Sequence, residues 1–319
     1  LWDLQSGDEI RSTARVSASE KTEVTPEIVS QSRQLVGHQG WVLAIALTPD
    51  GLCAVSGSHD KTLKIWDLES GEVLRTLVGH TDDVNAVAVT PNATHVISGS
   101  GDKTLMLWDL QSRKLMRTLD NHKIAVMAVA LTPDGTRAVS ASWDNTIKVW
   151  DLKSGEVLRT LEGHTTHINA VVITPDGTRV VSGSKDRTLK VWDLESGELL
   201  RTLEGHRGIV WAVAVTTDGK CVVSGSTDRT LKVWNLDNGV LLHTLAGHSD
   251  TVEAVEVSLD GRRVVSGSKD RTLKMWDLES GKLLLTLDGH TDTIFAVAVT
   301  SDGRRVVSGS RDKTIRVWD

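Results

Sequence analysis

A repeat of 42 residues runs through most of the chain. The dipeptide Gly-His or Asn-His occurs seven times at this spacing, from His38 to His290. A Trp stands 28 residues after each of these His, from Trp66 to Trp318, and Asp follows it in every unit but one, where Asn235 does. Seven copies without insertion or deletion indicate a repeat architecture, and a period near 40 residues is typical of propeller blades.

One unit, from His164 to His206, predicts four short β-strands over residues 168–174, 179–184, 188–193 and 198–203. These segments are rich in β-branched and apolar residues, and clusters of Pro, Asp, Gly and Ser separate them. No segment carries the apolar period of a helix. A four-stranded antiparallel meander leaves two faces and two edges exposed, and radial stacking of such sheets buries both faces.

With these motifs the chain resembles the WD-repeat (WD40-type) family over residues 37–319. The resemblance implies an all-β fold, a seven-bladed β-propeller of four-stranded antiparallel blades. The last unit, from Gly289, has 31 residues and lacks a fourth strand, whereas residues 29–36 align with the fourth strand of the other units. We therefore expect a closing strand within residues 26–36 to pair with the C-terminal blade, which makes residues 26–319 the propeller.

The first 25 residues fit the repeat less well. Residues 1–6 repeat the sequence of residues 107–112, but 22 extra residues, polar and rich in Ser, Thr and Glu, separate them from the first complete unit. We interpret residues 1–25 as a partial repeat remnant and polar linker, and expect the chain to be part of a longer protein.

Composition excludes several classes of partner. The net charge is −6 and the pI about 6.0, which disfavours a nucleic-acid binder, because phosphate contacts need clustered Lys and Arg. No apolar run reaches the roughly 18 residues that span a bilayer, so we expect no membrane partner. Cys53 and Cys221 stand in units too far apart to form a disulfide, and we expect free thiols and a cytoplasmic protein.

Each unit repeats one His, one Ser, one Asp and one Trp at constant spacing. Seven equivalent copies argue against a nucleophilic triad, which needs one exposed Ser beside an oxyanion hole. The resemblance instead implies a buried hydrogen-bonded tetrad in each blade. The tetrads are His38, Ser56, Asp60, Trp66; His80, Ser98, Asp102, Trp108; His122, Ser140, Asp144, Trp150; His164, Ser182, Asp186, Trp192; His206, Ser224, Asp228, Trp234; His248, Ser266, Asp270, Trp276; and His290, Ser308, Asp312, Trp318. We expect no catalytic residue, no metal and no cofactor, since the phosphate-loop, HExxH and CxxC motifs are absent.

Comparison of the seven copies shows where they diverge. Three positions vary most: three and five residues after the tetrad His, and immediately before the tetrad Asp. In an antiparallel meander these positions lie at one end, around the mouth of the central channel. The three Trp outside the WD pattern and the only Phe also fall there. The candidate partner-binding residues are Trp41, Leu43, His59, Met127, Trp143, His167, Lys185, Trp211, Glu253, Lys269, Phe295 and Arg311.

WD-repeat proteins commonly bind partners at this end, and aromatic side chains anchor many interfaces. We therefore expect a non-catalytic scaffold for a protein or peptide partner. Lys185, Lys269 and Arg311 favour an acidic peptide with an apolar anchor. Three other interpretations stay open: a sensor or autoinhibitory domain of a larger signalling enzyme, as in similar bacterial WD-repeat arrays; a glycan or small-molecule site on Trp41, Trp143 and Trp211; and aromatic side chains that merely plug the channel.

Overall fold

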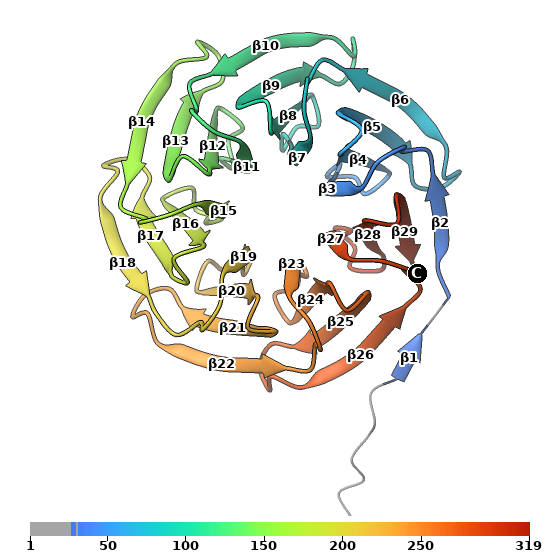
Figure 1. Cartoon of the computed structure of the whole chain (residues 1–319), viewed down its shortest axis with the longest axis vertical. Coiled ribbons are helices and arrows are strands. Elements are labelled where there is room, and N and C mark those ends of the chain that lie inside the picture. Colours follow the sequence, from blue (N-terminus) through green and yellow to red (C-terminus); the bar gives the residue numbers. More distant parts are fainter. Residues whose placement is uncertain (1–26, 30) are drawn as a thin grey trace, which may run out of the picture.

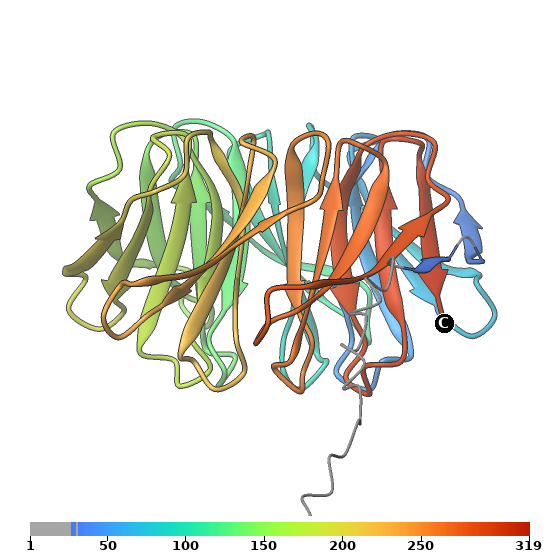
Figure 2. The ribbon, with the colours of Figure 1, turned by 90° about the horizontal axis from the view of Figure 1, so that it is seen from below.

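Seven β-sheets stand radially around a central channel and form a closed ring (Figure 1). The computed structural model describes residues 27–29 and 31–319, which contain 29 β-strands. Seen from the side, the strands run between the two faces of the ring (Figure 2). Within the described ranges, no helix is long and apolar enough to cross a membrane.

Each sheet is one blade of the ring. Blade 1 consists of β3 (Val42–Leu47), β4 (Cys53–Ser58), β5 (Thr62–Asp67) and β6 (Val73–Val78); blade 2 of β7 (Val84–Val89), β8 (His95–Ser100), β9 (Thr104–Asp109) and β10 (Leu115–Asp120); and blade 3 of β11 (Val126–Leu131), β12 (Arg137–Ser142), β13 (Thr146–Asp151) and β14 (Val157–Glu162). Blade 4 consists of β15 (Ile168–Ile173), β16 (Arg179–Ser184), β17 (Leu189–Asp193) and β18 (Leu199–Leu203); blade 5 of β19 (Val210–Val215), β20 (Cys221–Ser226), β21 (Thr230–Asn235) and β22 (Leu241–Ala246); and blade 6 of β23 (Val252–Val257), β24 (Arg263–Ser268), β25 (Thr272–Asp277) and β26 (Leu283–Asp288). Blade 7 contains β27 (Ile294–Val299), β28 (Val306–Ser310) and β29 (Thr314–Trp318).

The predicted all-β, seven-bladed fold is confirmed. Within each blade, successive strands pair in antiparallel fashion, and the first strand lies innermost, against the channel (Figure 1). The four strands predicted in unit four agree with β15 to β18 within one residue at each end. The first strands also contact one another around the ring, and β27 of blade 7 contacts β3 of blade 1.

The N-terminal segment closes the ring, as the repeat arithmetic predicted. Strand β2 (Arg33–Val36) is the fourth strand of blade 7 and pairs antiparallel with β29, where Leu35 lies opposite Ile315. The structure also shows a second strand, β1 (Glu27–Val29), which pairs in parallel with the outer edge of β26 in blade 6. The predicted closing segment thus comprises two strands on two blades; three residues carry too little pattern to predict β1. Residues 1–25, interpreted as a repeat remnant, lie outside the described residues.

The hydrophobic core lies between the blades. It divides into seven clusters, each drawn from two adjacent blades. At the closing junction, Leu35 and Ile315 from blade 7 pack with Trp66 of blade 1. The blades approach so closely that a Cβ on Gly309 would lie 2.6 Å from Val42 Cγ1 across this junction. Each sheet therefore depends on its neighbours for burial, as in other repeat proteins.

The closing junction can be tested with two neighbouring residues of β2. Leu35 is 3% exposed and Val36 is 71% exposed. We expect Leu35→Ala to lower the free energy of unfolding by about 2–5 kcal/mol, because it leaves a cavity in the closing cluster. Val36→Ala is the matched control and should change it by less than about 0.5 kcal/mol. Equal effects of the two substitutions in denaturant unfolding would contradict the assigned role of β2.

Candidate interaction face

Hydrogen bonds link the four repeated residues of every blade. In blade 4, His164 Nδ1–H donates to Asp186 Oδ2 (2.7 Å), the Ser182 hydroxyl donates to His164 Nε2 (2.8 Å), and Trp192 Nε1–H donates to Ser182 Oγ (2.9 Å). The same three bonds, all between 2.7 and 3.0 Å, occur in the other six blades. The Ser side chains are fully buried. They therefore cannot reach a substrate as nucleophiles.

Ionisation of the tetrad follows from these bonds. Burial opposes ionisation of Asp60, but hydrogen bonds from Thr62, the Gln39 amide and His38 outweigh it and lower the pKa of its carboxyl to about 2. Burial lowers the pKa of His38. An ionised carboxylate can only accept, so the neutral His carries its proton on Nδ1 and leaves Nε2 to accept from Ser.

The tetrad Asp also holds the loops at one end of the ring. In blade 1, Asp60 Oδ2 accepts from the Gln39 backbone amide (2.9 Å), and Asp60 Oδ1 accepts from the Thr62 hydroxyl (2.6 Å). Equivalent bonds recur in all seven blades. One carboxylate thus joins the loop that enters the first strand to the turn between the second and third strands.

The residue after each tetrad Asp adopts a left-handed backbone conformation, with φ between 69° and 75° in all seven blades. In blade 1 the Lys61 amide donates to the Ser58 carbonyl and closes the turn. Six of these residues are Lys or Arg with exposed side chains, and the seventh is Asn145. Sequence reasoning found the basic residues but not their strained conformation, because neither Lys nor Arg favours positive φ.

We call this end of the ring the mouth face, defined by the twelve candidate residues from Trp41 to Arg311. In every blade, the amide of the residue before the tetrad Asp donates to the carbonyl of the residue three after the tetrad His; for His59 and Trp41 the distance is 2.9 Å. The side chains five after the His line one cavity of about 300 Å³ at the channel. They are Leu43, Asn85, Met127, Asn169, Trp211, Glu253 and Phe295. The three variable positions therefore do lie together.

Trp41 is packed within the mouth face. Its ring stacks on His59 at 4.9 Å between centroids, and the Arg311 guanidinium lies over it at 4.4 Å. Phe295 lies 6.2 Å from it. His59 in turn pairs with Asp83 of blade 2 at 2.5 Å. Side chains from three adjacent blades thus surround Trp41, so its truncation would disturb these internal contacts.

Trp143 belongs to a second cluster, between blades 3 and 4. Its ring stacks on His167 at 5.1 Å with an angle of 17° between the planes. Trp143 Nε1–H donates to Asn169 Oδ1 (3.1 Å), and Asn169 Nδ2 donates to the Val210 carbonyl of blade 5 (3.1 Å). Asn85 makes the equivalent bond to the Val126 carbonyl (3.0 Å). The predicted partner-binding residues did not include Asn85 and Asn169, although both stand five residues after a tetrad His, as Trp211 does.

Trp211 differs from the other two. Among the described residues, it has no aromatic stacking partner and its Nε1–H has no acceptor. In the ring of channel-lining residues it stands one blade before Glu253 and two before Phe295. Burial raises the pKa of Glu253 to about 7, although the Lys269 ammonium partly opposes this shift. Lys185 and Lys269 are exposed, and neither pairs with a carboxylate of the described chain.

A second carboxyl in blade 6 lies where most other blades have Ala. Glu256 pairs in register with Val265, which belongs to the core between blades 6 and 7. Paired residues share a face of the sheet, so Glu256 faces blade 7. Burial raises the pKa of its carboxyl to about 7, and no described cation forms an ion pair with it. This residue destabilises the ring when it is ionised.

Cys53 and Cys221 are free thiols, as expected. No group of three or more His, Cys, Asp or Glu side chains within the described ranges is arranged to hold a metal ion.

A closed ring of seven four-stranded blades, each with this hydrogen-bonded tetrad, defines a seven-bladed β-propeller. The WD domain, G-beta repeat model matches seven segments of the chain: residues 29–67, 71–109, 113–151, 155–193, 197–235, 239–277 and 281–319. These segments cover well over half of the sequence. The protein belongs to the WD-repeat family.

Curated relatives match the chain over about one repeat. Nuclear distribution protein PAC1 of Scheffersomyces stipitis is 65% identical over 34 residues, which are 11% of this chain and 6% of PAC1. Pre-mRNA-splicing factor PRP46 of Yarrowia lipolytica is 46% identical over 44 residues, 14% and 10% of the two chains. Human pleiotropic regulator 1 is 51% identical over 41 residues, 13% and 8% of the two chains. The aligned parts thus span a tenth or less of each relative.

Removal of a single hydroxyl group tests how much the tetrad contributes to stability. In Ser182→Ala, Trp192 Nε1–H and His164 Nε2 lose their buried partner, and each orphaned group costs about 1–3 kcal/mol. We therefore expect a clear fall in the free energy of unfolding, measured by denaturant titration. Thr165→Ala, in an exposed loop of the same blade, removes a hydroxyl with no hydrogen-bond partner among the described residues and should leave stability within about 0.5 kcal/mol of the unsubstituted protein. A neutral Ser182→Ala would mean that the tetrad bonds contribute little.

Glu256 predicts a pH dependence of stability. Its carboxyl titrates near pH 4.5 when unfolded and near 7 when folded, so the folded state loses stability as the pH rises from about 4.5 to 7. Glu256→Ala should therefore stabilise the protein by up to about 3 kcal/mol at pH 8, and much less at pH 4.5. Denaturant unfolding at the two pH values measures the difference, with the exposed-turn variant Glu198→Ala as control. A gain that does not change with pH would contradict the assignment.

Proposed function

We propose that the protein is a non-catalytic docking platform that binds a peptide or protein partner on its mouth face. The observation that carries this proposal is Trp211, whose ring and indole N–H have no internal stacking or hydrogen-bond partner among the described residues, although they line the cavity of about 300 Å³. Trp is enriched among interface residues that dominate binding energy. Proteins that resemble this one as WD-repeat propellers commonly use the same end of the ring.

The partner that fits best is an acidic peptide with one large apolar side chain. The apolar side chain would enter the cavity between Leu43, Met127, Trp211 and Phe295. Carboxylates beside it would meet the ammonium groups of Lys185 and Lys269, which are exposed and form no ion pair with a described carboxylate. Such charges steer association and set orientation more than they add affinity. We also propose a cytoplasmic location, which two free thiols favour.

Selection from a random peptide library tests this function. We expect the protein to enrich peptides with an aromatic or large aliphatic residue next to Asp or Glu. Trp211→Ala should weaken the best peptide at least about tenfold, which corresponds to the 1–2 kcal/mol expected of an aromatic anchor, measured by calorimetry. Its melting temperature should stay close to that of the unsubstituted protein.

The matched control is Leu200→Ala on an outer strand, where the side chain is 47% exposed. It should leave peptide affinity unchanged. Enriched peptides that bind Trp211→Ala as tightly as the unsubstituted protein would overturn the proposal, and so would a selection that enriches none.

A further inference from the structure

On the face opposite the mouth face, arginine side chains cross from one blade to the next. The residue at or next to the start of each second strand supplies them: it is Arg in blades 3, 4, 6 and 7, His95 in blade 2, and Cys in blades 1 and 5. In blade 3, Arg137 Nη1 pairs with Glu195 Oε2 of blade 4 at 3.0 Å. In blade 7, Arg305 Nη2 pairs with Glu69 of blade 1 at 3.5 Å.

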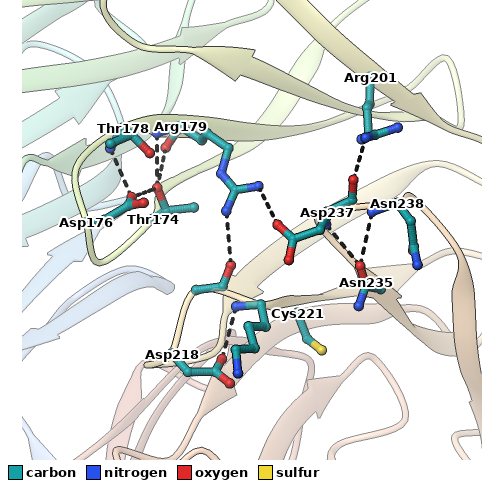
Figure 3. Close-up of polar contacts among 12 residues, drawn as sticks. Thr174, Asp176, Thr178, Arg179, Arg201, Asp218, Cys221, Asn235, Asp237 and Asn238 are labelled. Atoms are coloured by element: carbon teal, nitrogen blue, oxygen red, sulfur yellow. Dashed lines mark hydrogen bonds and ion pairs between the residues drawn. The ribbon is translucent and has the colours of Figure 1, made fainter.

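The junction between blades 4 and 5 shows the arrangement in full (Figure 3). Arg179 Nη1 donates to Asp237 Oδ1 (3.2 Å), and Arg179 Nη2 donates to the Gly219 carbonyl (3.5 Å). Arg201, from the outer strand β18, donates to the Asp237 carbonyl. Two guanidinium groups of blade 4 thus bind the turn of blade 5 that contains Asp237, and Arg179 also reaches the turn that contains Gly219.

The next junction keeps the acceptors but lacks both cations. Cys221 replaces Arg179 and His243 replaces Arg201, one repeat later. At the previous junction, Arg179 donates to the Asp237 carboxylate and the Gly219 carbonyl. The equivalent acceptors here are the Glu279 carboxylate and the Gly261 carbonyl. Neither receives a hydrogen bond or ion pair from a described residue. A cleft of about 720 Å³ opens here, and Cys221, His243, Gly261 and Glu279 line it.

The other walls of the cleft suit a long side chain with a charged end. Val233, Leu242 and Leu278 supply apolar surface. Burial raises the pKa of the Cys221 thiol, which therefore stays neutral. Asp277 also lines the cleft, but its carboxylate accepts from the Ser280 amide and hydroxyl of its own turn. Arg262 is the one Lys or Arg among the described residues of the lining, and its side chain is exposed.

We propose that this cleft between blades 5 and 6 binds an arginine side chain of a partner peptide. The guanidinium takes the place that Arg179 occupies one junction earlier and donates to the Glu279 carboxylate and the Gly261 carbonyl. Arginine suits this site better than lysine, because its planar fork can donate to two acceptors at once. The site is separate from the mouth face, so it does not depend on the function proposed there.

Binding of acetyl-Gly-Arg-Gly-amide, followed by NMR titration of the full chain, tests the proposal. We expect the arginine peptide to shift signals of residues around the cleft and to bind more tightly than the lysine and citrulline analogues. Glu279→Gln should weaken it about tenfold, the size of one charge-assisted hydrogen bond. Cys221→Arg should abolish binding, because its own guanidinium would fill the cleft, and should raise the melting temperature.

Cys53→Arg is the matched control. It makes the same substitution at the same register of blade 1, where the facing turn of blade 2 carries Gln111 in place of the carboxylate. It should leave peptide binding unchanged. Absence of arginine-peptide binding, equal binding of the citrulline analogue, or binding that persists in both Cys221→Arg and Glu279→Gln would overturn the proposal.

Discussion

Burial of both faces of every sheet is the constraint on which this structure depends. No blade has a core of its own, because each hydrophobic cluster is shared by two neighbours. The ring therefore has to close, and Leu35 of β2 supplies the apolar side chain that joins blade 7 to blade 1. Contacts as close as that between Gly309 and Val42 leave little tolerance for larger residues at the junctions. The carboxyl of Glu256, set into one such junction, has a raised pKa for the same reason.

The tetrads connect this core to the loops at the mouth. The same Asp carboxylate that binds the buried His also holds a loop amide and a turn hydroxyl, as Asp60 does in blade 1. The tetrads therefore hold the loops of the mouth face in the same way in every blade, while the side chains on these loops differ. Trp41 stacks on His59 and lies under Arg311 there, whereas Trp211 has no stacking partner among the described residues. On the opposite face, Cys221 replaces a bridging arginine, and the Glu279 carboxylate has no ion-pair partner among the described residues.

Much of the fold and of the candidate site could be predicted from the sequence, because the seven copies align without gaps and a prediction made for one unit applies to all of them. The four strands of unit four and the three divergent positions follow from spacing and alternation, and the closing strand follows from the length of the last unit together with the resemblance to WD-repeat propellers. Three features could not be predicted from the sequence. The parallel pairing of β1 with β26 depends on a three-residue strand, the left-handed conformation at Lys61 contradicts its usual preference, and the bonds of Asn85 and Asn169 reach backbone carbonyls of the next blade.

The sequence by itself determined the number of blades, because the copies can be counted along the chain. It also determined the register of the strands and the hydrogen-bonding groups inside each blade, because these depend on residues within a single 42-residue unit. Only the tertiary structure decided which side chains of neighbouring units meet. Arg179 and Asp237 are 58 residues apart, and so are Cys221 and Glu279. Whether such residues touch depends on the angle and distance between packed sheets. The interlocking of side chains at each junction sets this angle and distance, and no pattern within one unit encodes them.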